Sequence, residues 1–165
     1  MLRTPTDALI TAICIFLLSP SAFSQDRADD REAIDALMWS YARALDTFDP
    51  GAYVALYTED GQFVAGGNAT EGREALWQMI EDLRVDREER AATGNPAAPM
   101  YHMTADSWTE FVDDTHARHH TYWLTVTGAA GGNPVNVLAA GRGVDELVKV
   151  GGRWLIQRRD VTPRD

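Results

Sequence analysis

The chain has 165 residues, of which 45% are hydrophobic, and a formal net charge of -10 at pH 7. This length suits one well-packed domain and is short for two. The excess of 25 acidic over 15 basic residues would repel the phosphates of a nucleic acid. We therefore expect one globular domain that does not bind nucleic acid.

The first 24 residues have the pattern of an export signal. Arg3 precedes the apolar run Ala8–Leu18, and small residues up to Ser24 offer a cleavage site. A retained membrane anchor is the alternative, but the run falls well short of the roughly 20 apolar residues that span a bilayer. We expect a signal peptide at residues 1–24 and a mature domain at residues 25–165. That domain would be secreted or periplasmic, with no membrane attachment after cleavage.

The N-terminal half of the mature chain predicts three helices. Apolar residues recur at spacings of three and four over residues 34–48, with Asp29 or Asp30 as the helix cap. DPGAYVALY predicts a short second helix capped by Asp49, and TEDG then leads to a short strand, QFVA. After the loop GGNATEG, a third helix covers residues 73–83 and ends in the solvated charge run RVDREER. The loop AATGNPAAP is a hinge or lid candidate.

The C-terminal half predicts strands. They cover roughly residues 100–112, 116–126, 135–150 and 153–161. The Gly-Gly pair in KVGGRW supplies the positive φ angles of a tight hairpin turn. Arg153 and the closing arginines are expected on an exposed strand edge, with Trp154 packing inward. Three helices followed by an antiparallel meander predict an α+β domain in which a bent sheet wraps over a helix.

Two residues of the first helix stand out. At 100 degrees per residue, Tyr41 lies near the middle of the apolar stripe and Asp46 lies about 140 degrees further round, at its margin. An acid in the last turn meets the negative end of the helix dipole, which costs up to about 1 kcal/mol unless a donor or cation offsets it. We therefore expect a partner for Asp46. On the residues alone, a core tyrosine and a capping acid are the alternatives.

Three segments together resemble a known family. YARALDTFDPGAYVALYTEDGQFV, YHMT and GRGVDELVKVGGRWLIQRR are similar to the SnoaL-like branch of the nuclear transport factor 2-like superfamily, over about Arg31 to Arg159. The resemblance implies a cone in which three N-terminal helices pack on a curved, mostly antiparallel sheet around a deep apolar pocket. The superfamily includes ketosteroid isomerase, scytalone dehydratase, bile acid 7α-dehydratase and a hexachlorocyclohexane dehydrochlorinase. These enzymes share the pocket and not one reaction, so residues must decide the function.

The resemblance implies a catalytic group of Tyr41, Asp46 and His102. In the dehydratase and dehydrochlorinase branches, an acid at the Asp46 position orients a histidine that His102 in MYHMT matches. In the bile acid dehydratase a tyrosine stands five residues before the acid, as Tyr41 does here. The imidazole can remove and return a proton near neutral pH, and the carboxylate fixes its tautomer. With a phenol to stabilise an oxyanion or protonate a leaving hydroxyl, these groups need no cofactor for an elimination.

The motif HARHH adds three histidines. On a strand, His119 and His120 face opposite ways, so at most one faces the pocket, and His116 lies on the side of His120. Scytalone dehydratase places a second histidine on the corresponding strand, which makes His119 or His120 a catalytic candidate. Ordinary surface or core histidines are one alternative. A metal site is another, but no carboxylate stands at ligand spacing and we expect no metal.

Aromatic residues and one acid are candidates for binding a substrate. The aromatic candidates for contact with a flat ring are Tyr53, Tyr57 and Trp123. Asp145 in GVDELV aligns with the acid that donates a hydrogen bond in ketosteroid isomerase, but we favour a structural acid paired with Arg142 or Arg158. The base of that isomerase should fall near Ala65, which cannot accept a proton. Steroid isomerisation by that mechanism is therefore not expected.

We therefore expect a secreted, cofactor-independent lyase that acts on a small hydrophobic ring compound by dehydratase-like proton abstraction and elimination. A non-catalytic small-molecule-binding domain of the same fold is one alternative. A polyketide-cyclase-like or isomerase-like enzyme is another. We also expect a homodimer built through the outer face of the sheet, because VNVLAA and YWLTV carry apolar residues on both sides of their strands.

Overall fold

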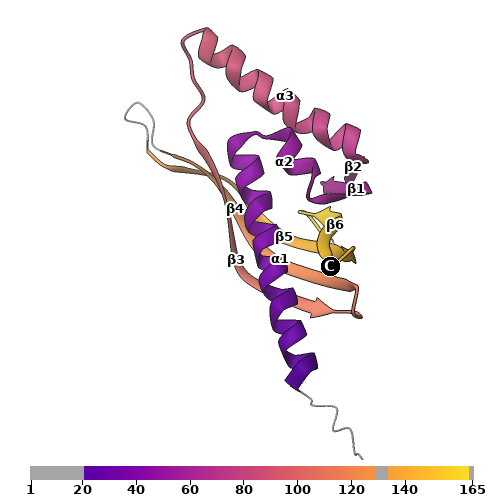
Figure 1. Cartoon of the computed structure of the whole chain (residues 1–165). Coiled ribbons are helices and arrows are strands. Elements are labelled where there is room, and N and C mark those ends of the chain that lie inside the picture. Colours follow the sequence, from indigo (N-terminus) through magenta and orange to yellow (C-terminus); the bar gives the residue numbers. More distant parts are fainter. Residues whose placement is uncertain (1–20, 129–133, 164–165) are drawn as a thin grey trace, which may run out of the picture.

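The computed structural model describes residues 21–128 and 134–163. The apolar segment of the predicted export signal and most of the glycine-rich loop before the third long strand lie outside these ranges. The helices and strands are α1 (Ser21–Thr47), α2 (Pro50–Val54), β1 (Tyr57–Ala65), β2 (Asn68–Glu71), α3 (Arg73–Ala92), β3 (Met100–Phe111), β4 (His116–Thr127), β5 (Asn136–Val150) and β6 (Arg153–Asp160). Figure 1 shows α1 lying across the long strands, with α2 and α3 beyond its C-terminal end.

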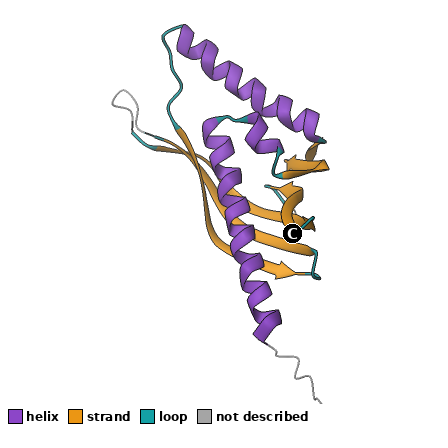
Figure 2. Cartoon of the chain, viewed as in Figure 1, coloured by secondary structure: helices purple, strands orange, loops and turns teal. Residues whose placement is uncertain are grey.

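The strands form one six-stranded sheet in the order β2-β1-β6-β5-β4-β3. Every neighbouring pair is antiparallel except β1 and β6, which run parallel. The helices and the curved sheet in Figure 2 confirm the predicted α+β class. However, β6 lies between β1 and β5 inside the sheet. The expectation that the closing arginines occupy an exposed edge strand is therefore wrong, because the parallel partner β1 covers that edge.

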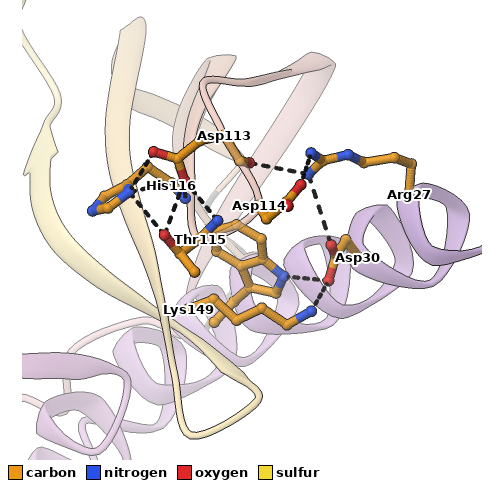
Figure 3. A network of polar contacts seen from close by, with 8 residues as sticks. Arg27, Asp30, Asp113, Asp114, Thr115, His116 and Lys149 are labelled. Atoms are coloured by element: carbon orange, nitrogen blue, oxygen red, sulfur yellow. Dashed lines mark hydrogen bonds and ion pairs between the residues drawn. The ribbon is translucent and has the colours of Figure 1, made fainter. Parts of the chain in front are cut away.

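Asp30 lies inside α1 and is not its cap. Its Oδ1 accepts hydrogen bonds from Nζ of Lys149 at 2.6 Å and from Nε1 of Trp154 at 2.9 Å. Arg27 lies 4.0 Å from Asp30 and also binds Asp114 at 2.7 Å, so the network joins α1 to β5 and to the turn after β3 (Figure 3). Burial alone would raise the pKa of Asp30, but the bonds from Lys149 and Trp154 outweigh it and the pKa is lowered. The predicted helix start is wrong: α1 begins at Ser21, and the side chain of Asp30 binds two residues of the sheet and does not cap the helix.

The C-terminal end of α1 is a Schellman motif. The N–H of Phe48 donates to the carbonyl of Leu45 at 3.2 Å, and that of Asp49 donates to the carbonyl of Ala44 at 3.0 Å. Phe48 has a φ of 54°, in the left-handed region where glycine is usual. Asp49 then caps α2 by accepting from the N–H of Ala52 at 2.9 Å, as the sequence predicted.

Two Gly-Gly pairs close tight hairpins. The pair at 151–152 has φ angles of 58° and 81°, which confirms the turn predicted from KVGGRW. The pair at 66–67, with φ angles of 59° and 82°, joins β1 to β2 in a segment expected to be a loop. β1 is also longer than the predicted strand QFVA. It begins at Tyr57, which already pairs with Ile156 of β6.

Helix α3 continues through the charge run to Ala92, where the sequence predicted an end near Leu83. Arg84 forms ion pairs with Glu81 and Glu88, at the i,i+3 and i,i+4 positions that neighbour each other on a helix surface. Such pairs each add a few tenths of a kcal/mol to helix stability. The charge run is therefore solvated, as predicted, and helical as well.

The core lies between the helices and the concave face of the sheet. Trp154 packs inward, as predicted. No helix within the two described ranges is long and apolar enough to cross a membrane. The side chains that form the core include Ile34, Leu37, Met38, Tyr41, Tyr53, Tyr57, Leu76, Ile80, Leu147, Trp154 and Ile156.

Candidate active site

A cavity of about 280 Å³ opens between α1, α3 and the concave face of the sheet. Most of its wall is apolar, and a few polar side chains enter it from different elements. The residues that line it are Tyr41, Ala42, Leu45, Tyr53, Phe63, Met79, Ile80, Leu83, His102, Met103, Thr104, Trp123, Leu124, Thr125, Ala139, Arg159 and Val161.

The structure brings Asp46 and His102 together at this cavity. Oδ1 of Asp46 lies 3.0 Å from Nδ1 of His102 and also accepts the main-chain N–H of His102 at 2.8 Å. The two side chains are 9% and 21% exposed, respectively. Since a carboxylate only accepts, the favourable arrangement places the proton on Nδ1. Nε2 of His102 is then unprotonated and can act as a base.

Two elements position this pair. Asp46 stands in the last turn of α1, where the helix dipole disfavours a negative charge. His102 lies near the start of β3 and pairs with Thr125 of β4, so its side chain points to the concave face with that of Thr125. Nη1 of Arg43 lies 3.4 Å from Oδ2 of Asp46. The donors on His102 and the cation of Arg43 provide the partners that an acid at this helix end requires.

Three tyrosines contact one another in a row, and two of them line the same cavity as His102. Tyr41 is 4% exposed, lines the cavity and has its ring centroid 5.5 Å from that of Tyr53. The hydroxyl of Tyr53 lies 2.9 Å from that of Tyr57. Burial raises the pKa of Tyr53 and of Tyr57 well above the ordinary value, so both phenols are neutral at physiological pH. Tyr53 lines the cavity with Tyr41, whereas Tyr57 lies behind Tyr53 and supports it.

A buried arginine completes the polar part of the wall. Arg159 is 2% exposed, lines the cavity, and places its Cζ 4.0 Å from the centroid of the Tyr41 ring. Its Nη1 donates to Oδ2 of Asp145 at 2.6 Å. Burial raises the pKa of Asp145, and the positive charge of Arg159 opposes that rise. The sequence predicted Arg142 or Arg158 as the partner of Asp145, and the structure instead gives Arg159. Asp145 lies behind Arg159, outside the cavity lining of the described residues.

Strict strand alternation points to the wrong arginine because β6 contains a bulge. Leu147 of β5 pairs with Ile156, but the adjacent Glu146 pairs with Arg158, so β6 has one extra residue here. The inward side then passes from Ile156 to Arg159, which pairs with the buried acid on β5. The apolar positions preceding Arg158 predict an inward Arg158, so no local signal identifies Arg159.

The candidate histidines of β4 lie outside the cavity lining of the described residues. His119 faces the concave side, is 2% exposed, and has its Nδ1 2.9 Å from Oγ1 of Thr109. Burial, assisted by the charge of Arg159, lowers the pKa of His119 to about 4. His120 faces the other way and stacks on Trp108 with ring centroids 5.1 Å apart. His119 is therefore the inward member of the pair, in contact with Thr109.

Trp123 lines the cavity in a fixed orientation. Its Nε1 donates to the carbonyl of Val161 at 3.1 Å. Its ring lies so close to Gly141 that a Cβ there would come within 2.7 Å of the indole. The third aromatic candidate thus forms a flat part of the cavity wall, fixed by this hydrogen bond and by its close packing on Gly141. Across residues 21–128 and 134–163, no three His, Cys, Asp or Glu side chains are grouped to hold a metal ion.

Comparisons with known proteins place this geometry in context. A family model described as "SnoaL-like domain" matches residues 26–160. No curated protein matches the chain. A candidate scytalone dehydratase from Novosphingobium aromaticivorans is 25% identical with a TM-score of 0.66, over 83% of this chain and 85% of that one.

Two further solved structures share the fold at lower identity. One is a nuclear-transport-factor-2-like protein with a cystatin-like fold from N. aromaticivorans, 20% identical with a TM-score of 0.72 over 92% of each chain. The other is a hexachlorocyclohexane dehydrochlorinase from Novosphingobium barchaimii, 18% identical with a TM-score of 0.65, over 83% of this chain and 88% of that one. The nuclear transport factor 2-like fold is thereby confirmed.

Proposed function

The chain belongs to the SnoaL-like domain family, and on this premise we propose that it is a cofactor-independent lyase acting on a small hydrophobic ring compound. One observation carries the proposal: Asp46 holds His102 at the wall of an apolar cavity. A domain that only binds a small molecule, without converting it, gains nothing from a base oriented in this way. The apolar wall and the flat face of Trp123 suit a ring compound with few polar groups.

In this mechanism, Nε2 of His102 removes a proton from the ring carbon next to the carbon that bears the leaving group. The electrons of the broken C–H bond form the double bond, and the bond to the leaving group breaks. Asp46 stabilises the imidazolium that forms. A leaving hydroxyl takes a proton back from the imidazolium and departs as water, whereas a halide departs as the anion and the proton passes to solvent.

Tyr41 and Arg159 can stabilise the negative charge that develops during this step. Tyr41 and Arg159 both line the cavity, and Cζ of Arg159 lies 4.0 Å from the centroid of the Tyr41 ring. A fixed cation and a phenol donor in a mostly apolar site act more strongly than the same groups in water. The names of two similar structures, a dehydratase and a dehydrochlorinase, are those of enzymes that catalyse eliminations, which supports the same class of reaction.

The experiment is a screen of steroid, polyketide and halogenated ring compounds for loss of water or halide. The parent protein is compared with the double variant Asp46→Asn/His102→Ala. Conversion by the parent and none by the variant supports the lyase. Compounds that bind the parent by calorimetry without any conversion contradict it and favour the non-catalytic binding domain.

We further propose that the protein acts outside the cytoplasm. The support is the sequence pattern of residues 1–24 alone. Mass spectrometry of the protein from its native host should find an N-terminus at or near Gln25. An intact Met1 would contradict export by signal cleavage.

A further inference from the structure

Arg87 of α3 contacts two segments that are distant from each other in sequence. Its guanidinium Cζ lies 4.4 Å from the ring centroid of Phe48. Its Nη2 also donates to the main-chain carbonyls of Ala97, at 3.3 Å, and Ala98, at 3.2 Å. Both carbonyls belong to the proline-containing segment between α3 and β3, which the sequence marked as a hinge or lid candidate.

Each contacted segment leads directly to one member of the Asp46–His102 pair. Phe48 follows Asp46 by two residues and ends α1 through the Schellman motif, with a left-handed φ of 54° and a buried ring. Ala98 precedes His102 by four residues. A residue without glycine's freedom keeps this conformation only where its surroundings hold it. The ring of Phe48 is held, in part, by the guanidinium that also binds the segment before His102.

We propose that Arg87 is a positioning residue that fixes the end of α1 and the start of β3 relative to each other, and so holds Asp46 against His102. Arg87 lies outside the cavity lining of the described residues and acts only through other groups. An arginine suits this task because its planar group can stack on an aromatic ring while its N–H groups donate in the same plane. The proposal rests on the proposed role of the pair, but its test does not need a substrate.

The test measures the tautomer of His102 by long-range ¹H–¹⁵N NMR on the full-length mature protein. With Asp46 in place, neutral His102 carries its proton on Nδ1, and an imidazole released from the carboxylate shifts toward the Nε2–H form. Arg87→Met keeps an apolar stem beside Phe48 and removes both the donors and the charge. We expect the ratio of the Nδ1–H to the Nε2–H form to fall about fivefold, which corresponds to the loss of about one hydrogen bond.

Two further variants make the result decisive. Arg90→Met changes an arginine of the same helix that is paired with Asp86, and it should keep the parent ratio. Arg87→Lys keeps the cation and its N–H donors but loses the planar guanidinium, and it should give a ratio between those of the parent and Arg87→Met. If Arg87→Met does not fold, Arg87→Lys decides alone, and a parent ratio overturns the proposal.

A folded Arg87→Met variant with the parent ratio also overturns the proposal, whatever the activity screen finds. If the ratio falls as expected while no compound is converted, Arg87 positions the pair and the proposed lyase function fails on its own. The two ideas can therefore be separated by one set of variants.

Discussion

Asp46 and His102 are joined twice through one oxygen, because Oδ1 of the acid accepts from both the ring Nδ1 and the main-chain N–H of the histidine. The main-chain bond fixes the carboxylate relative to the backbone of β3, and the ring bond then fixes the imidazole. Nε2 is left as the basic nitrogen at a cavity wall that is mostly apolar.

Asp46→Asn should therefore lower turnover without preventing the ligand from binding in the cavity. An amide at this position carries no negative charge to stabilise the imidazolium, and its NH2 group can donate to Nδ1 and so stabilise the wrong tautomer of His102. In serine proteases the comparable change lowers kcat by about 10⁴, and we expect a loss of about 10² to 10⁴ here. Steady-state kinetics and calorimetry check this prediction together. A variant with the parent kcat, or one that no longer binds the ligand, would contradict it.

Asp145→Asn should destabilise the fold strongly. The change leaves Arg159 charged and without a counter-ion at a site where both side chains are 2% exposed or less. Breaking such a buried pair costs about 3–5 kcal/mol of unfolding free energy.

Asp160→Asn is the matched control for that variant. Asp160 binds the partly exposed Arg158, and its loss should cost at most about 1 kcal/mol. Urea unfolding at pH 7 measures both values. Similar losses of unfolding free energy in the two variants would show that the buried Asp145–Arg159 pair contributes no more to stability than the partly exposed pair.

His119 should make the fold sensitive to acid. Its pKa is about 4 in the folded protein against an ordinary 6.5, so the unfolded chain takes up this proton first as the pH falls. The stability it contributes is complete above pH 6.5 and is lost as the pH falls through about 4. A difference of this size corresponds to about 3 kcal/mol.

His119→Gln removes this acid sensitivity and keeps a side chain that can bind Thr109. The free energy of unfolding of the parent should therefore fall more steeply between pH 6.5 and pH 4.5 than that of the variant. Asp145, whose pKa is raised, acts in the opposite direction but is present in both proteins, so the difference between the two curves isolates His119. Parallel curves would show that burial does not lower the pKa of His119.

The outer face of the sheet should form a homodimer. Trp108 and Tyr122 are 61% and 60% exposed on β3 and β4, and Leu138 of β5 is 57% exposed. Exposed apolar side chains of neighbouring strands commonly mark an interface. Light scattering should give a dimer for the parent and a monomer for Trp108→Lys/Tyr122→Lys. Trp39→Lys, at a helix residue that is 69% exposed, should remain a dimer. A parent monomer at micromolar concentration would contradict the interface.

The helices and the long strands could be predicted because local signals decide them. Asp49 is a capping residue followed by a proline, and the Gly-Gly pair at 151–152 supplies the two positive φ angles that a tight hairpin turn requires. The pairing of Asp46 with His102 was predicted from a resemblance, since 56 positions separate the two residues and no local pattern connects them.

The contacts that were missed are non-local. Asp30 resembles a helix cap until Lys149 and Trp154 of the sheet are placed beside it. Arg159 resembles a surface residue until β1 pairs with β6 and the bulge in β6 turns its side chain inward. Each of these contacts depends on which helices and strands become neighbours, and the periodicity of a single helix or strand carries no information about its neighbours.

The most direct test of the central claim compares two histidine variants on the first compound that the parent converts. His102 and His116 each pair with an aspartate, at 3.0 Å and 2.9 Å, but His116 lies at the exposed start of β4, beside Asp113 of the preceding turn (Figure 3). His102→Ala should lower kcat by about 10² to 10⁴, the usual contribution of a general base, while the dissociation constant stays within a few-fold of the parent value. His116→Ala should match the parent in both quantities. Conversion by His102→Ala at the parent rate would contradict a catalytic base at this site.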